Sequence, residues 1–372
     1  MDADTNRAGR AAVQRYSPRC GRWRVERWAV LACAWLLTIA TGGCRKPAPD
    51  STAPPPSAPP PPTVTLYCSI DESFARTILG TFRAETGIDT KIVFDSEAGK
   101  TTGLVKRIMT EARGSGARAD VFWSSELFGT IALARAGLLE PYEPPSAADI
   151  PKRFHDAGHL WTATAARGRV IAFDPARMSA DALPTRWEQL AEKRFSGITT
   201  IANPLFGTTR GHVAAMFALW GADRGRAFLT KLRDGGVMIS DGNSAAVRAV
   251  MSGRAKIAAT DTDDVWLARR GGASLDLRYL DMGDGGTLMI PCSVAIIKGG
   301  GHGEAARRLV DFLVSARVER MLAESDSRNV PVRARLRETM HIPWPTETSV
   351  TFDAVADALP QSDRAVREIL IR

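Results

Sequence analysis

The sequence has few of the residues that hydrolytic and zinc sites need. Its 372 residues include five cysteines and five histidines. No two cysteines form a CxxC pair, and no HExxH or GxSxG motif occurs anywhere in the chain. These absences leave the chain without the common zinc-site, zinc-protease and serine-hydrolase motifs. We therefore expect a protein that is not an enzyme, with a hydrolase kept as a weaker alternative.

No apolar run is long enough to span a bilayer as a helix. The longest run at the N-terminus, residues 28–40, has 13 residues, whereas a spanning helix needs about 20. Several arginines precede it, which is typical of a signal peptide. Thr41-Gly42-Gly43-Cys44 resembles a lipobox. We predict a signal peptide at residues 1–43, a lipidated Cys44 and a Pro-rich tether at residues 44–62. An ordinary secretory signal or an N-terminal anchor is the alternative.

Little net charge remains outside this leader. The formal charge of the chain is +8, and residues 1–62 hold nine basic and four acidic residues. The remaining 310 residues therefore carry a net charge of only +3. A net charge this small does not indicate the strongly basic surface that nucleic-acid binding needs. The size of this part is sufficient for substantial hydrophobic cores.

Residues 64–105 alternate between strand and helix patterns. Val64, Leu66 and Cys68 alternate in a run of strand-forming residues, and Ile78 and Phe82 then recur at helical spacing. A second strand and helix follow, and residues 304–322 predict one further helix. This order indicates an α/β fold with parallel strands, in which ligands bind beyond the carboxyl ends of the strands.

Several segments resemble the ferric-iron-type periplasmic solute-binding proteins of ABC importers. The first segment is residues 64–105, which contains the pattern F-x-x-E-T-G-I at residues 82–88. The others are ADVFWSSELF (119–128), AGLLEPY (136–142), GRVIAFD (168–174), GNSAAVRAV (242–250) and EAARRLVDFLVS (304–315). The resemblance implies the two-lobed type II periplasmic-binding-protein fold, in which each lobe is a mixed sheet flanked by helices and the ligand cleft lies between the lobes. It implies lobe 1 at residues 63–166, lobe 2 at 167–286, and a return to lobe 1 with C-terminal helices at 287–372.

The resemblance also implies a function and its partners. The protein is expected to work as a monomer on the periplasmic or extracellular face, held to the membrane by its lipid anchor. It would capture a small molecule or metal between the lobes, close over it and deliver it to an ABC permease and its ATPase. A ligand sensor for a membrane receptor is an alternative use of the same fold.

Two turns are candidate anion sites because each follows a strand and opens a helix. Free N–H groups and the positive end of the helix dipole favour anions there. By resemblance, two arginines near the hinge could grip a carboxylate or phosphate. The candidate ligand-binding residues of this kind are Gly207, Thr208, Thr209, Asn243, Ser244, Arg167, Arg169 and, in two further turns, Ser69 and Ser96. Plain helix capping and an interlobe salt bridge are the competing interpretations.

A set of acidic residues stands at strand ends. Carboxylate oxygens suit hard cations, so we expect a metal ion with an anion as one form of the cargo and no other cofactor. By resemblance, the metal candidates are Asp71, Glu126 and Asp263. Capping of helices by these carboxylates is the competing interpretation.

The sequence departs from the resembling family at one point that concerns the cargo. Ferric binders of the family have two adjacent tyrosines where this chain has Thr262 and Asp263. Both residues remain candidates for ligand contact. An organic or phosphorylated anion, a carboxylate-held metal with an anion, and a cation framed by Trp123, Trp266 and carboxylates are the cargoes left open.

The two cysteines of the folded part allow a disulfide. By resemblance, Cys68 and Cys292 both lie on strands of the first lobe. If those strands are neighbours, the two Cα atoms can approach within about 7 Å, the limit for a disulfide. Two buried thiols are the alternative.

Overall fold

The computed structural model of the chain describes residues 61–95 and 101–371. The predicted signal peptide, the Cys44 lipidation site, most of the tether and Ser96 lie outside these residues. No helix in the described part of the chain has both the length and the apolarity that crossing a bilayer requires.

Strands and helices alternate as the sequence predicts. The described strands are β1 (Thr63–Cys68), β2 (Asp89–Phe94), β3 (Val121–Ser124), β4 (Leu139–Glu140), β5 (Thr162–Phe173), β6 (Thr199–Ala202), β7 (Met238–Ser240), β8 (Ile257–Asp261), β9 (Asp276–Tyr279) and β10 (Met289–Ile297). The described α-helices are α1 (Glu72–Thr86), α2 (Thr102–Arg113), α3 (Phe128–Arg135), α4 (Gly207–Trp220), α5 (Ala222–Asp234), α6 (Asn243–Met251), α7 (Thr262–Arg270), α8 (Gly303–Leu313), α9 (Ala316–Glu324), α10 (Ala334–Met340) and α11 (Phe352–Ile369).

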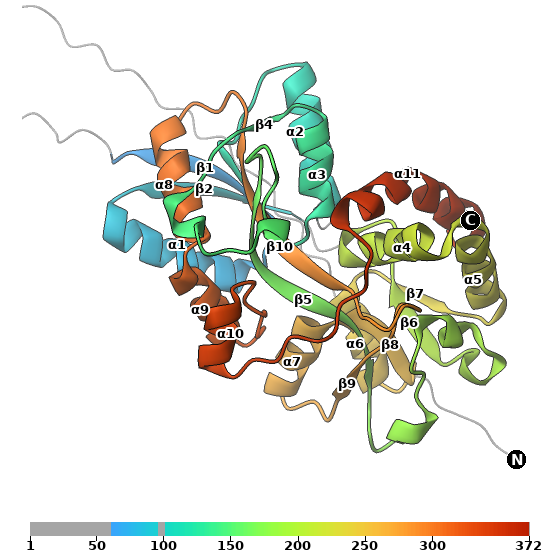
Figure 1. The fold of residues 1–372 in the computed structure, drawn as a ribbon. Helices are drawn as coiled ribbons and strands as arrows, with labels where there is room; N and C mark the ends of the chain where they lie inside the picture. The colour runs from blue at the N-terminus through green and yellow to red at the C-terminus, as the bar shows by residue number, and fades with distance from the viewer. Residues whose placement is uncertain (1–60, 96–100, 372) are drawn as a thin grey trace, which may run out of the picture. The chain divides into compact units, whose positions relative to one another are not determined.

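One long strand belongs to two sheets. The strand order is β2-β1-β3-β10-β5-β8-β6-β7, with β4 beside β10 and β9 beside β5. Residues 162–168 of β5 pair with β10, and residues 169–173 pair with β8 and β9. The change of partners falls between Gly168 and Arg169, so β5 runs from the first lobe into the second (Figure 1).

Each lobe is a sheet with apolar residues on both faces. In the first lobe, Leu66 and Cys68 join a core with α1, α8 and α9, whereas Tyr67 joins a core with α2 and α3. In the second lobe, Val170 packs with α6 and α7, and Ile171 faces the core of α4 and α5. Successive strand residues thus point to opposite faces, which confirms the α/β fold with helices on both sides.

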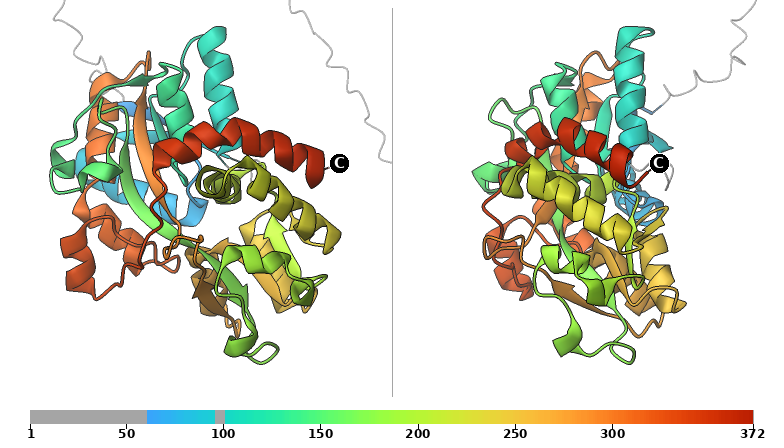
Figure 2. Two further views of the ribbon diagram at one scale, coloured as in Figure 1. Left: turned by 45° about the vertical axis from the view of Figure 1, so that its right-hand side comes forward. Right: turned by 90° about the vertical axis from the view of Figure 1, so that its right-hand side faces the viewer.

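The C-terminal helix packs on the second lobe. Helix α11 lies against α4 and α5, as both views of Figure 2 show. Val355, Leu359 and Val366 are buried in the same core as Val213 and Phe217 of α4. The residue range 287–372 that we predicted as the return therefore includes a helix that covers the other lobe.

One predicted helix is divided in two. Residues 304–322 form α8 and α9 rather than a single helix. Ser315 lies between them with an extended backbone, and its Oγ accepts a hydrogen bond from Val318 N at 3.3 Å. A serine that caps the second helix competes with continuation of the first.

The two cysteines do not form the disulfide that we considered. Both are free and buried. Strand β3 lies between β1 and β10, so Cys68 is opposite Trp123, and Trp123 is opposite Val294. Two strand spacings amount to about 9.5 Å, which exceeds the reach of a disulfide. The premise of neighbouring strands was wrong.

Candidate functional site

A pocket opens between the two lobes and contains most of the predicted ligand-binding residues. We call it the interlobe pocket. Asp71 and Ser125 line it from the first lobe, and Arg167 lines it from β5. The second lobe supplies the other lining residues, which are Ala202, Asn203, Phe206, Gly207, Thr208, Thr209, Asp241, Gly242, Asn243, Asp261, Asp263 and Asp264.

Two helices of the second lobe begin at this pocket. Helix α4 follows β6, and α6 follows β7. Among the described residues, neither Phe206 at the start of α4 nor Gly242 at the start of α6 caps its helix with a side-chain hydrogen bond. The first backbone N–H groups of both helices are therefore the donors available to a bound anion. Gly207 has φ +53°, so a side chain at this position would strain the turn.

The polar side chains of the same two turns surround a buried carboxylate. Asp261 is fully buried and forms a salt bridge to Arg169 at 2.6 Å. Its Oδ2 accepts hydrogen bonds from Thr208 Oγ1 at 2.5 Å and Asn243 Nδ2 at 2.8 Å. Thr209 Oγ1 in turn donates to Asn243 Oδ1 at 3.2 Å. These side chains therefore hold the two turns together. Because they bond to one another, the groups of the turns that remain for a ligand are the backbone N–H groups.

Arg169 does not line the interlobe pocket. It is fully buried, and its Nε also donates to Nδ1 of His212 at 3.3 Å. His212 is buried edge-on against Trp187 with ring centroids 4.1 Å apart. This part of the network is a structural core of the second lobe.

Arg167 is the cation that faces the pocket. It is 7% exposed, and its Nη1 lies 2.9 Å from Oδ2 of Asp263. Burial would lower the pKa of Arg167, but the carboxylate of Asp263 and further acidic neighbours raise it well above its usual value. Arg167 Nε is buried and has no hydrogen-bond partner among the described residues. A ligand in the pocket could satisfy this donor.

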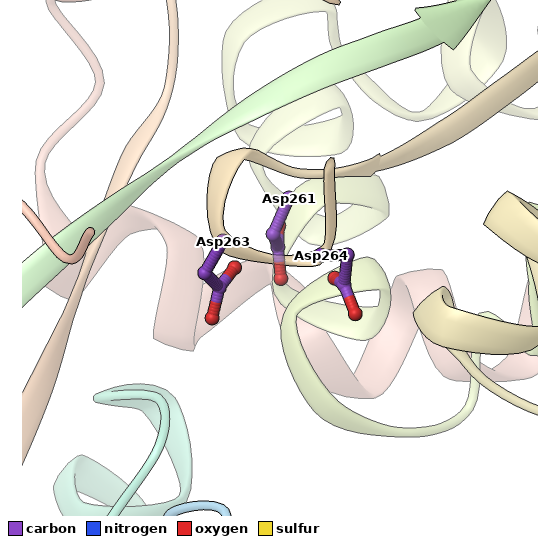
Figure 3. A group of neighbouring side chains, drawn as sticks. All are labelled: Asp261, Asp263 and Asp264. Carbon is purple, nitrogen blue, oxygen red and sulfur yellow. The ribbon is translucent and has the colours of Figure 1, made fainter. Parts of the chain in front are cut away.

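Three carboxylates cluster where β8 meets α7. Figure 3 shows Asp261, Asp263 and Asp264, and one oxygen from each lies within 4.8 Å of the others. Asp261 is paired with Arg169, and Asp263 is paired with Arg167. Asp264 accepts hydrogen bonds from Ser244 Oγ at 3.0 Å and from Thr260 Oγ1 at 3.2 Å. A metal ion here would compete with arginine for two of the three carboxylates, Asp261 and Asp263.

The three metal candidates from the sequence do not form one site. Asp71 and Asp263 line the interlobe pocket, but Glu126 does not. Glu126 is buried and accepts hydrogen bonds from Phe128 N at 2.6 Å and Gly129 N at 3.0 Å, which caps α3. Burial raises the pKa of Glu126 to about 6, although the two N–H donors partly oppose this. The capping interpretation fits its contacts.

Two further candidates contact the protein itself. Ser69 Oγ lies 3.0 Å from Thr101 Oγ1 and accepts from Ser125 N at 2.8 Å, so it supports the first-lobe wall of the pocket. Thr262 Oγ1 accepts a hydrogen bond from Gly168 N at 3.1 Å, which ties α7 to the point where β5 changes sheets. Ser69 and Thr262 are both absent from the lining residues.

None of the three tyrosines in the described chain lines the pocket. Tyr67 donates to Oε1 of Glu111 at 2.6 Å, and burial with this contact raises its pKa to about 12.

Trp123 and Trp266, the aromatic residues predicted to frame a cation, do not line the pocket either. Trp123 is fully buried, and Trp266 packs under the guanidinium groups of Arg269 and Arg328.

Sequence reasoning missed several pocket residues that follow strands directly. Asn203 comes after β6, Asp241 after β7 and Ser125 after β3. Their position at carboxyl strand ends is the signal that could have identified them.

Comparisons with known proteins agree with this geometry. A probable ABC transporter periplasmic-binding protein of Sinorhizobium fredii is 29% identical over 225 residues, which cover 58% of this chain and 60% of the relative. The match thus spans less than two thirds of that protein. The iron-bound HitA structure from Pseudomonas aeruginosa matches 83% of this chain and all of its own, with 25% identity and a TM-score of 0.69.

A third protein shares the fold at lower identity. It is AfuA from Actinobacillus pleuropneumoniae, solved with fructose-6-phosphate bound, which matches 83% of this chain and 98% of its own at 19% identity and a TM-score of 0.71. These neighbours show the two-lobed periplasmic-binding fold. The family pattern for bacterial extracellular solute-binding proteins matches residues 119–351, which is more than half of the chain. The chain belongs to the family of bacterial extracellular solute-binding proteins.

Proposed function

We propose that this protein captures a small ligand through an anionic group in the interlobe pocket and delivers it to an ABC importer. The delivery role follows the Sinorhizobium relative, which is named a probable ABC transporter periplasmic-binding protein. The anionic group would bind to the backbone N–H groups at the starts of α4 and α6 and to Arg167.

One observation carries the choice of an anion. Arg167 is a buried, cationic side chain in the pocket wall whose Nε has no hydrogen-bond partner among the described residues. An unsatisfied buried donor on a charged group is costly. A carboxylate or phosphate oxygen that reaches it would satisfy it with a charge-assisted bond.

Direct ferric binding by tyrosinates does not fit this pocket. HitA is an iron-bound relative, but the positions that carry the tyrosine pair in the resembling family are Thr262 and Asp263 here. The Thr262 hydroxyl contacts Gly168 N, and Asp263 is paired with Arg167. The fold itself accommodates a phosphorylated sugar in AfuA, which makes a phosphorylated or carboxylated molecule a reasonable cargo.

A ligand screen on the full chain tests this proposal. We expect saturable thermal stabilisation by at least one of inorganic phosphate, citrate, fructose 6-phosphate and a phosphonate, because a ligand that binds only the folded state adds about 2.7 kcal/mol at a hundredfold excess over Kd. Fructose is the matched uncharged control and should give no shift. Ferric iron should give no visible phenolate charge-transfer band. A coloured ferric complex, or stabilisation by cations alone, would show that the anion proposal is wrong.

The proposal includes a lipid anchor at Cys44, which rests on the arginines, the short apolar run and the lipobox-like sequence. Radiolabelled palmitate should be incorporated into the wild type and lost in Cys44→Ala. Equal incorporation in both proteins would contradict lipidation at this residue.

A further inference from the structure

We propose that Cys292 is a positioning residue for the anion site: its sulfur fixes the orientation of the Arg167 guanidinium in the wall of the interlobe pocket. This inference rests on the proposed function, because it concerns the same arginine.

Two contacts from different lobes hold the guanidinium. Nη1 of Arg167 pairs with Oδ2 of Asp263 on α7 at 2.9 Å, and Nη2 donates to Sγ of Cys292 on β10 at 3.2 Å. A planar group held at one nitrogen can still turn about that contact. A second contact at the other terminal nitrogen fixes the plane, and Nε is then the nitrogen of the group that has no hydrogen-bond partner among the described residues.

The surroundings of the thiol suit it to this role. Cys292 is fully buried, and its S–H donates to the carbonyl oxygen of Ser125 at 3.7 Å. The lone pairs of the sulfur are therefore left to accept from Arg167. Burial raises the pKa of the thiol, and Arg167 opposes this only in part. A neutral acceptor orients the guanidinium without cancelling the positive charge that attracts an anion.

The orientation of Arg167 can be measured without any ligand. In the full chain labelled with ¹⁵N-arginine, the Arg167 Nε–H signal is identified by its loss in Arg167→Lys. We expect slow rotation of the Nη groups in the wild type, faster rotation in Cys292→Ala, and near wild-type behaviour in Cys292→Ser, which keeps an acceptor. Cys68→Ala is the matched control, because Cys68 is an equally buried thiol of the same lobe that donates to Ile70 O.

Titration with inorganic phosphate measures the consequence for binding. Loss of one neutral hydrogen bond to Arg167 should weaken phosphate binding by about three- to tenfold in Cys292→Ala. Cys292→Ser should stay within about twofold of the wild type, and Cys68→Ala should not differ. Unchanged Nη rotation in Cys292→Ala would overturn the positioning role. Unchanged phosphate affinity in Arg167→Lys would instead overturn the proposed function, so the two failures are distinguishable.

Discussion

Replacing Arg169 by methionine should lower the free energy of unfolding by about 3–5 kcal/mol, because removal of one partner from a buried ion pair leaves an uncompensated charge. Arg169 and Asp261 are both fully buried and their charged atoms lie 2.6 Å apart. Thr208 and Asn243 would still donate to Asp261, but neutral donors only partly replace the lost cation. Denaturant titration of the full chain measures the change.

A surface pair in the same lobe provides the control. Arg226 of α5 pairs with Glu368 of α11 at 2.8 Å, and both side chains are about half exposed. Arg226→Met should cost about 0–1 kcal/mol, the usual value for exposed pairs. The double variant Arg169→Met/Asp261→Asn should be less destabilised than Arg169→Met, since no buried charge is then left alone. Equal costs for Arg169→Met and Arg226→Met would contradict the structural role that we assign to Arg169.

The layers of the fold were predictable because their signals are local. Leu66 and Cys68 alternate with Tyr67, and the structure places them in different cores. The starts of α4 and α6 were also predictable, since Gly207 and Gly242 each follow a strand. What remained hidden was the division of residues 304–322 into two helices, because a capping serine and a helical serine have the same sequence signature until packing selects one.

The roles of the two hinge arginines were beyond sequence reasoning. Arg167 and Arg169 are two residues apart and so project from the same face of a strand. Only the exchange of strand partners at Gly168 separates them, so that Arg167 reaches the pocket and Arg169 enters the core of the second lobe.

Glu126 illustrates a second ambiguity. A carboxylate after a strand can bind a ligand or cap the next helix. Here the carboxylate of Glu126 accepts hydrogen bonds from the N–H groups of Phe128 and Gly129.

Arg167→Met should abolish most of the affinity for whichever anion the screen identifies. A charge-assisted hydrogen bond contributes about 1.5–3 kcal/mol, so loss of even one bond should weaken binding by roughly ten- to a hundredfold. The variant also leaves Asp263, which is 6% exposed, without its arginine at the pocket wall. That carboxylate would then repel the incoming anion, which acts in the same direction.

Two further variants separate the geometry of Arg167 from its charge. Arg167→Lys keeps a cation near Asp263 but cannot present the planar fork of a guanidinium, so its affinity should fall between those of the wild type and Arg167→Met. Arg177→Met removes an arginine that pairs with Asp174 at 3.2 Å away from the pocket, and it should bind normally. Calorimetric titration measures the affinity of the wild type and of the three variants for the anion, and circular dichroism checks that each variant is folded. If a folded Arg167→Met binds the anion as tightly as the wild type does, the interlobe pocket is not where the anion binds.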